Sequence, residues 1–306
     1  MTSRFSIIVP THNRPDQLVL CLKAMAALQY PTRGFEVLVV NDGGVLPPER
    51  ELAEVSAAIP LTILSQQRAG PARARNLGAM RACGEILAFT DDDCAPMPNW
   101  LAALDDTIQR APHALVGGRT INVLPHSPCS EASQLLIEYL YGYYNGDVDR
   151  GAKFFASNNM AISASGFRDL RGFDSSFGRA AAEDRDLCAR WHRAGGRFCY
   201  VPEAVVRHAH AMSLASFARQ HFRYGRGAFQ YRVRHSIRNR QRVRVEPLAF
   251  YVGLLGFPFR RYSRLWAAKV GLLMGFSQVA NAAGFFWERG ATKLRKSGGK
   301  QCVKLC

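Results

Sequence analysis

The chain has 306 residues, with 40 Lys and Arg against 24 Asp and Glu, and eight cysteines. This length allows one large domain or two small ones. The cysteines form no CxxC pair and show no zinc-like spacing, which argues against a disulfide framework and predicts reduced, mostly buried thiols. The N-terminal residues begin a strand pattern directly and lack the pattern of a signal peptide, so we expect a cytoplasmic protein.

The positive charge is concentrated at the C-terminal end. Residues 206–306 carry 20 Lys and Arg against two Asp and Glu, a net charge of +18. Residues 1–205 carry 20 against 22, a net charge of −2. A basic segment of this kind is attracted to an anionic surface such as phospholipid headgroups or nucleic acid.

Short apolar strands alternate with helices over the first ninety residues. Strands are expected at residues 4–10, 35–40, 61–66 and 85–89, and helices at residues 16–28, 49–59 and 71–82. Strands joined by helices in this way form a parallel sheet with helices on both faces. The pattern therefore predicts an α/β fold with a Rossmann-like, mostly parallel sheet.

Polar residues follow three of these strands. The strand ends read PTHNR, NDGG and TDDD, and ligands of parallel sheets gather at the carboxyl ends of the strands. Asp91, Asp92 and Asp93 are adjacent, and like charges this close repel one another. They need a cation or water, although a solvated loop in which Asp93 caps a helix is the alternative.

The pattern is less regular from residue 115 to residue 205. Further strands are expected at residues 114–124 and 198–202, and a helix at residues 183–196, where Gly195 and Gly196 end it. Beyond this region, residues 216–246 interleave arginine with aromatic residues, and apolar stretches follow at residues 247–259 and 265–287.

The last apolar stretch, residues 265–287, is long enough to span a bilayer. Lys269, Gln278 and Asn281 interrupt it, and polar groups inside a bilayer are costly. We therefore expect an interfacial or re-entrant hairpin, with helices packed against the preceding domain as the alternative.

Five segments between residues 4 and 210 together resemble a known family. They are SIIVPTHNRPDQLVLCLKAM, FEVLVVNDGG, RAGPARARNLGAMRACGEILAFTDDDCAPMPNWL, FFASNNMAISASGFRDLRGFDSSFG and EDRDLCARWHRAGGRFCYVPEAVVRH. In this order they resemble the family 2 glycosyltransferases, inverting enzymes with the GT-A fold. The resemblance implies a catalytic domain over residues 1–210 and a basic, apolar helical extension over residues 211–306, as in bacterial enzymes of polysaccharide biosynthesis.

The resemblance implies transfer of a sugar from a nucleotide-diphosphate sugar, with a UDP-sugar favoured, to a hydroxyl of a glycan or lipid-linked acceptor. It places a group of residues beside the nucleotide: Pro10, Thr11, His12, Asn13 and Arg14. Asp42 would accept the imide N–H of the base, with an Asx turn at Gly43 and Gly44 as the alternative. Arg75 would reach the donor phosphates from a helix N-terminus, while Arg73 would face solvent.

The resemblance also implies a divalent cation, Mn²⁺ or Mg²⁺, at the TDDD motif. A hard cation held by carboxylate oxygens would screen the charge of the departing diphosphate. Asp93 is the expected direct ligand, Asp91 the contact to ribose or to a metal-bound water, and Asp92 a solvated residue at the variable position that also lies beside the nucleotide. His208 would add an imidazole, or would be unligated.

The acidic pair Glu183 and Asp184 is where the family places its general base, which takes the proton of the acceptor hydroxyl. We expect Asp184 to be this base, and Glu183 is the rival. A helix cap is the structural alternative for one of them. Asn158 and Asn159 would contact sugar hydroxyls or serve the core.

Two other classes of function deserve comparison. A nucleotidyltransferase would carry a Gly-rich, Lys-containing phosphate loop at the first strand, and PTHNRPD has none. A nucleic-acid-binding protein would use the arginine-aromatic segment, but the apolar stretches that follow fit a membrane surface better. We therefore expect no nucleic acid partner and a peripheral position on the inner face of the cell membrane.

Overall fold

The computed structural model describes residues 3–145, 154–177, 182–239 and 246–302. The chain divides into two compact units. Among the described residues, the first unit contains residues 3–124, 140–177 and 183–210, and the second contains residues 125–139 and those from 211 onward. The predicted boundary after residue 210 stays a prediction.

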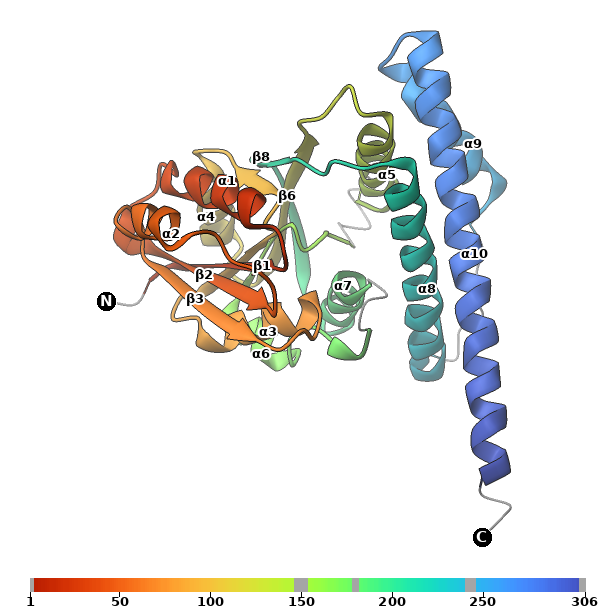
Figure 1. The fold of residues 1–306 in the computed structure, drawn as a ribbon, viewed down its shortest axis with the longest axis horizontal. Coiled ribbons are helices and arrows are strands. Elements are labelled where there is room, and N and C mark those ends of the chain that lie inside the picture. The colour runs from red at the N-terminus through yellow and green to blue at the C-terminus, as the bar shows by residue number, and fades with distance from the viewer. Residues whose placement is uncertain (1–2, 146–153, 178–181, 240–245, 303–306) are drawn as a thin grey trace. The chain divides into compact units, whose positions relative to one another are not determined.

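The first unit contains a sheet of eight strands in the order β3-β2-β1-β4-β7-β6-β8-β5. Figure 1 labels β1, β2, β3, β6 and β8. The pairs β1–β2, β2–β3, β1–β4 and β6–β8 are parallel, while β7 is antiparallel to both β4 and β6, and β5 is antiparallel to β8. The predicted α/β class with a mostly parallel sheet is confirmed. The strands are β1 (Phe5–Thr11), β2 (Phe35–Asp42), β3 (Leu61–Gln66), β4 (Ile86–Thr90), β5 (Cys94–Pro96), β6 (Ala114–Asn122), β7 (Asn159–Ser163) and β8 (Arg197–His208).

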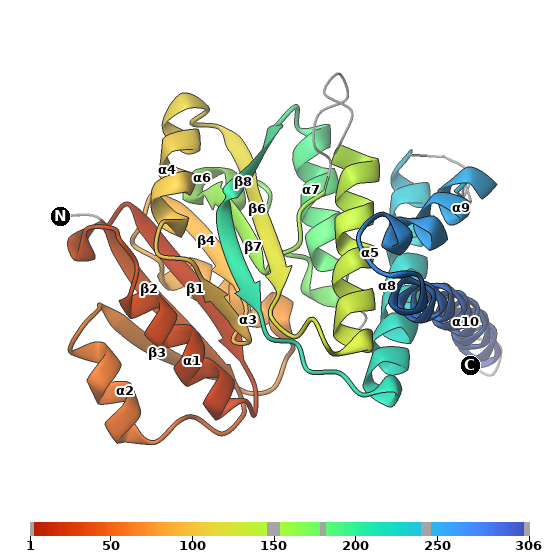
Figure 2. The same cartoon turned by 90° about the horizontal axis from the view of Figure 1, so that it is seen from above.

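Helices cover both faces of this sheet (Figure 2). One face packs against α1 (Pro15–Ala26), α2 (Glu49–Ser56) and α4 (Trp100–Arg110). The other packs against α3 (Pro71–Arg81), α6 (Ala164–Asp169) and α7 (Glu183–Arg193), and two short 3₁₀ helices lie at η1 (Thr32–Gly34) and η2 (Ser175–Phe177). Ile7 and Val9 of β1 enter the first core, whereas Ile8 enters the second. Burial on both faces explains why these strands read as continuous apolar runs.

β8 extends well beyond the strand predicted at residues 198–202. Pro202 has no backbone N–H to donate and suggested the end of a strand. The ladder with β6 instead shifts register between Gly118 and Arg119, so pairing resumes at Val205 and continues to His208. This irregularity carries the strand to the edge of the sheet where the TDDD motif lies.

The second unit contains α8 (Leu214–Asn239), α9 (Leu248–Gly256), η3 (Phe257–Arg260) and α10 (Arg264–Cys302), together with the first part of α5 (Pro128–Asn145). Two glycines bring α8 and α10 into backbone contact. A Cβ on Gly225 would lie 1.8 Å from the carbonyl oxygen of Asn281, and one on Gly284 would lie 1.9 Å from that of Phe222. The predicted apolar stretches are therefore helices, and α10 extends beyond the stretch predicted at residues 265–287.

A buried polar cluster fixes this helix pair further. Glu288 is 5% exposed and accepts hydrogen bonds from Arg226 at 2.6 Å and from Gln230 at 2.9 Å. Among the described residues, one helix is long and apolar enough to cross a membrane. It is formed by residues 264–292 of α10.

Candidate active site

The three aspartates occupy the turn between β4 and β5. The N–H of Cys94 donates to the carbonyl oxygen of Asp91 at 3.1 Å, which closes the turn. Asp91 accepts from Arg75, Asp92 from Thr11 and Arg14, and Asp93 from Arg14. Two arginines, one of them shared by Asp92 and Asp93, thus offset the mutual repulsion of the three carboxylates.

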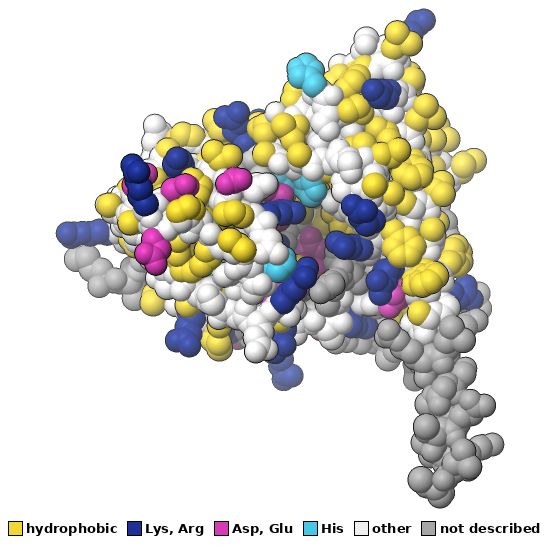
Figure 3. Space-filling view, viewed as in Figure 1, with side chains coloured by type: hydrophobic (Ala, Val, Ile, Leu, Met, Phe, Trp, Pro, Cys, Tyr) yellow, Lys and Arg dark blue, Asp and Glu magenta, His cyan; other side chains and the backbone are white. Residues whose placement is uncertain are grey.

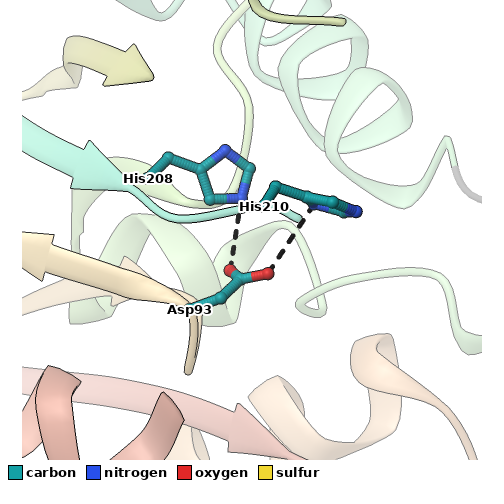
Figure 4. A group of neighbouring side chains, drawn as sticks. All are labelled: Asp93, His208 and His210. Atoms are coloured by element: carbon teal, nitrogen blue, oxygen red, sulfur yellow. Dashed lines mark ion pairs between the residues drawn. The ribbon is translucent and has the colours of Figure 1, made fainter. Parts of the chain in front are cut away.

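Asp93 lies beside two imidazoles from the end of β8 (Figure 4). His208 Nε2 is 3.2 Å from Asp93 Oδ1, and His210 Nδ1 is 3.7 Å from Asp93 Oδ2. The three ligand atoms all lie within 4.8 Å of one another. Antiparallel pairing places His208 opposite Cys94, and the Ala209 N–H donates to the Asp93 carbonyl at 2.9 Å. The backbone of β5 and β8 therefore builds this group.

Sequence reasoning named Asp93 and His208 and missed His210. The signal was the pair of histidines two residues apart in HAH, since residues i and i+2 of an extended segment point to the same side. The residues from Ala209 onward show no strand periodicity, so the sequence did not indicate that His210 faces the same side as His208.

The electrostatics of this group keep Asp93 ionised. Burial acts to raise the pKa of Asp93, but the hydrogen bond and charge of His208, together with Arg14, hold that pKa well below its usual value. Burial lowers the pKa of His210, and it acts in the same direction on His208, where the Asp93 carboxylate outweighs it and raises the pKa. One ionised carboxylate and two imidazoles suit Mn²⁺ better than Mg²⁺, which prefers oxygen ligands.

Asp92 is not solvated, so that interpretation is wrong. The residue is 4% exposed, and its carboxylate accepts from Thr11 Oγ1 at 2.8 Å and from Arg14 Nη1 at 3.1 Å. β1 and β4 are neighbours in the sheet, so the end of β1 lies against the aspartate turn. Burial raises the pKa of Asp92 to about 6, although Arg14 opposes the shift. Asp92 thus ties the end of β1 to the turn that follows β4.

The other residues predicted to lie beside the nucleotide at the end of β1 differ in burial and in their contacts. Pro10 and Thr11 are buried within β1. His12 Nδ1 is 2.9 Å from the carbonyl oxygen of Asp42, and Asn13, with φ of 55°, accepts from the Val45 N–H at 2.9 Å. His12 and Asn13 hold this loop against the end of β2, and the exposed Arg14 reaches over the aspartates.

Asp42 holds the start of α3. Its carboxylate accepts from Gln66 Nε2 at 2.7 Å, the Ala69 N–H at 2.6 Å and the Gly70 N–H at 2.8 Å. The alternative of an Asx turn at Asp42 is wrong, because Asn41 makes that turn, with two 2.8 Å bonds to Gly44. A carboxylate offers about four lone-pair sites, so the predicted contact to a base remains compatible with these bonds.

Arg75 points into the protein from α3. Its guanidinium donates to Asp91 Oδ1 at 2.6 Å and to Glu183 Oε1 at 3.1 Å, and its side chain is 5% exposed. Arg73, two positions away, is exposed as predicted. The structure therefore joins the aspartate turn to the acidic pair through one buried cation.

The acidic pair begins α7. Glu183 is buried, and Asp184 is partly buried and accepts from the Arg185 N–H at 2.7 Å. Burial and the Glu183 charge raise the pKa of Asp184 to about 7. Asp186 is fully buried and pairs with Arg190 at 2.7 Å, so it faces elsewhere as predicted.

Asn159 serves the core. It is fully buried, accepts from Trp100 Nε1 at 2.9 Å, and donates to the carbonyl oxygens of Arg119 and Ala204 at 3.0 and 2.9 Å. These bonds tie β7 to its neighbours. The expectation of a sugar contact therefore has no support at Asn159.

Comparison with known families decides the family of the chain. Residues 6–169, more than half of the chain, match the family described as Glycosyl transferase family 2. The chain belongs to this family. Residues 144–287 match a second description, Glycosyl transferase family group 2.

Two similar curated proteins come from bacteria. The chain is 29% identical to the pre-mycofactocin glycosyltransferase of Mycobacterium tuberculosis (strain CDC 1551 / Oshkosh), over 75% of this chain and 48% of that protein. It is also 29% identical to the succinoglycan biosynthesis protein ExoM of Rhizobium meliloti (strain 1021), over 73% of this chain and 74% of that protein. The chain thus spans about half the length of the first of these relatives.

Solved structures share the fold. The mannosyltransferase PcManGT from Pyrobaculum calidifontis, in complex with GDP-Man and Mn²⁺, has a TM-score of 0.65 at 18% identity and covers 94% of this chain and 88% of its own. TarS 1–349 of S. aureus, in complex with UDP-GlcNAc, has a TM-score of 0.54 at 16% identity and covers 95% and 92%. The GT-A architecture predicted from the sequence is therefore confirmed.

Proposed function

We propose that the protein transfers a sugar from a nucleotide-diphosphate sugar to an acceptor hydroxyl, with inversion at C1. The observation that carries this proposal is the placement of the Asp93, His208 and His210 group and of the Glu183 and Asp184 pair in one unit, linked through Arg75. Donor activation and acceptor deprotonation need these two kinds of chemistry.

Asp93, His208 and His210 would hold the divalent cation, for which we propose Mn²⁺. Asp91, at the start of the same turn, would contact the ribose or a metal-bound water. When bound, the cation screens the negative charge that develops on the departing diphosphate. Arg14 donates to Asp92 and Asp93, and its side chain is 44% exposed, so its guanidinium could also reach the donor phosphates.

Asp184 would accept the proton of the acceptor hydroxyl as the oxygen attacks C1. The C1–oxygen bond of the acceptor forms on the face opposite the nucleotide, and the bond to the diphosphate breaks. A base with a pKa near the operating pH is well suited to this proton transfer. Burial beside Glu183 gives Asp184 this property.

A donor screen with the purified full-length protein tests this function. UDP-sugars and GDP-sugars are compared for hydrolysis and for transfer, with and without Mn²⁺. We expect one nucleotide-sugar class, UDP-sugars first, to be consumed only with Mn²⁺. Equal rates in EDTA would contradict the metal assignment, and loss of nucleotidyl groups to an acceptor would indicate a nucleotidyltransferase.

We also propose a glycan or lipid-linked acceptor and association with an anionic membrane surface. The relatives named for succinoglycan and amylovoran biosynthesis support a glycan product. Hydrophobic side chains lie along the outside of α10 (Figure 3). Five of the exposed large side chains are spaced three, four or seven residues apart on one helix face: Leu265, Leu272, Phe276, Val279 and Phe286.

This apolar face extends over about 32 Å at 1.5 Å per residue. Its other side packs on the arginine-rich α8, which makes a lone membrane span of α10 unfavourable. An apolar face with a net positive charge of +18 in the same segment fits an anionic lipid surface. The proposed position is therefore interfacial.

A further inference from the structure

Arg75 sits between the two halves of the proposed chemistry, both within the first unit. One of its terminal nitrogens contacts Asp91 on the donor side, and the other contacts Glu183 next to the proposed base. Its guanidinium carbon also lies 5.7 Å from the centre of the Phe173 ring. A buried cation with two ionic partners and an aromatic neighbour has a fixed geometry.

The next residue, Asn76, fixes the loop beneath the guanidinium. Its amide donates to the Phe173 carbonyl at 2.8 Å and accepts from the Phe173 N–H at 2.9 Å. Gly172 precedes that contact with φ of +67°, and a Cβ there would lie 2.6 Å from Asn76 Oδ1. Adjacent residues of α3 therefore bind both the aspartate turn and the segment that leads to α7.

Solvent is largely excluded from Arg75, so its charge acts mainly on its two partners. Burial favours a neutral side chain, yet Asp91 and Glu183 together raise the pKa of Arg75. Removal of one partner from a buried ionic group leaves an uncompensated charge and is strongly destabilising. Without the guanidinium, Glu183 would repel both Asp184 and Asp91, and the start of α7 would shift.

We propose that Arg75 is a positioning residue: it holds Asp91 and Glu183 at a fixed separation, so that Asp184 faces the acceptor hydroxyl above the donor. This inference rests on the proposed function. It differs from the expectation that Arg75 binds the donor phosphates, because both of its terminal nitrogens are directed to protein carboxylates. A displacement of about 1 Å at a reacting group can cost about 10²-fold in rate.

The test compares Arg75→Gln with Arg73→Gln, a matched change at an exposed position of the same helix. We measure kcat, donor KM and, by calorimetry, the Kd of UDP with Mn²⁺. For Arg75→Gln we expect kcat to fall about 10²-fold, a larger factor than the rise in the Kd of UDP that displacement of Asp91 causes. Arg73→Gln should leave all three unchanged. A rise of tenfold or more in the Kd of UDP, with kcat retained, would show that Arg75 binds the donor instead.

Combination with Glu183→Gln separates positioning from a general structural role. If Arg75 acts through Glu183, the double variant Arg75→Gln/Glu183→Gln should have a higher kcat than Arg75→Gln alone, because the uncompensated carboxylate is gone. Additive losses would overturn the proposal. Should Arg75→Gln fail to fold by circular dichroism, Arg75→Lys carries the same comparison, and it should recover part of kcat with unchanged UDP affinity.

Asp184→Asn, measured alone, keeps this test distinct from that of the proposed function. A mild effect of Asp184→Asn would refute the base assignment, whatever the Arg75 variants do. A severe effect of Asp184→Asn together with an unimpaired Arg75→Gln would refute only the positioning role.

Discussion

The two units of the chain treat charge and apolar surface in opposite ways. The first unit buries apolar residues on both faces of its sheet and gives the buried carboxylates at the strand ends cationic, hydroxyl or N–H partners. The second unit leaves large apolar side chains exposed along α10 and belongs to a segment with 20 basic and two acidic residues. Clustered, paired charges suit a small, highly charged substrate, whereas an exposed apolar face with excess positive charge suits a lipid surface.

Loss of the metal group should have the largest effect. Asp93→Ala removes the carboxylate that both imidazoles face, so we expect loss of transfer and of Mn²⁺-dependent UDP binding in calorimetry, with an unchanged circular dichroism spectrum. Asp106→Ala, at an exposed position of α4, is the control. His210→Ala should weaken Mn²⁺ binding less than His208→Ala does, because its contact to Asp93 is longer, at 3.7 Å against 3.2 Å. Full activity of Asp93→Ala in EDTA would remove the metal from the account.

Loss of the base should rank second. Asp184→Asn should lower kcat by about 10² to 10⁴-fold, since this is the usual contribution of a positioned base, while the affinity for UDP stays nearly unchanged. Glu183→Gln should cost less, because Glu183 contacts Arg75 instead of the acceptor. The reverse order of severity would exchange the two roles. If both are mild, the base lies elsewhere.

The pH dependence should report the same carboxyl. Asp184 must be ionised to accept a proton, so kcat/KM should rise with pH and level off above an apparent pKa of about 7, because burial and Glu183 raise the pKa from 3.8.

The stability of the fold should change with pH in the opposite direction. The folded state favours the protonated form, so this group lowers the free energy of unfolding as pH rises between those two values. Asp184→Asn should abolish both trends, and an unchanged profile in that variant would exclude Asp184.

The smallest effect concerns the membrane, and it contrasts the two units directly. Leu272 of α10 is 76% exposed and Leu20 of α1 is 64% exposed. Leu272→Glu should reduce flotation of the full-length protein with anionic vesicles, whereas Leu20→Glu should not. Salt should weaken the binding, since each basic residue near the surface contributes about 1 kcal/mol. A change of oligomeric state in Leu272→Glu with vesicle binding retained would identify the face as a protein interface, and binding to DNA but not to vesicles would favour nucleic acid.

The sequence predicted the parts of the fold that depend on local patterns. Apolar runs ended by polar residues placed β1 to β4, and helix periodicity placed α1, α2, α3 and α7, each within a few residues. Strands β5 and β7 were not predicted. β5 has only three residues, and β7 lies antiparallel between β4 and β6, where pairing with distant segments determines it.

The site was predictable in its residue types and less so in its contacts. Asp93 follows β4, Asp184 lies at the start of α7 and His208 ends β8, so the motif and the place in the fold agree for each of them. The burial of Asp92 and the inward direction of Arg75 depend on which strand ends meet across the sheet. Periodicity along one helix or strand does not predict these contacts between distant segments. His210 was missed because it lies beyond the end of β8, and no pattern along the chain indicates that it faces Asp93.

The stereochemistry of transfer tests the central claim most directly. If Asp184 activates the acceptor for a single displacement at C1, the new glycosidic bond must have the anomeric configuration opposite to that of the donor. With an α-linked nucleotide-sugar that the donor screen identifies, ¹H NMR of the first product formed should show the β anomer. An α-linked first product would contradict the account, because retention requires a second displacement or an attack from the same face.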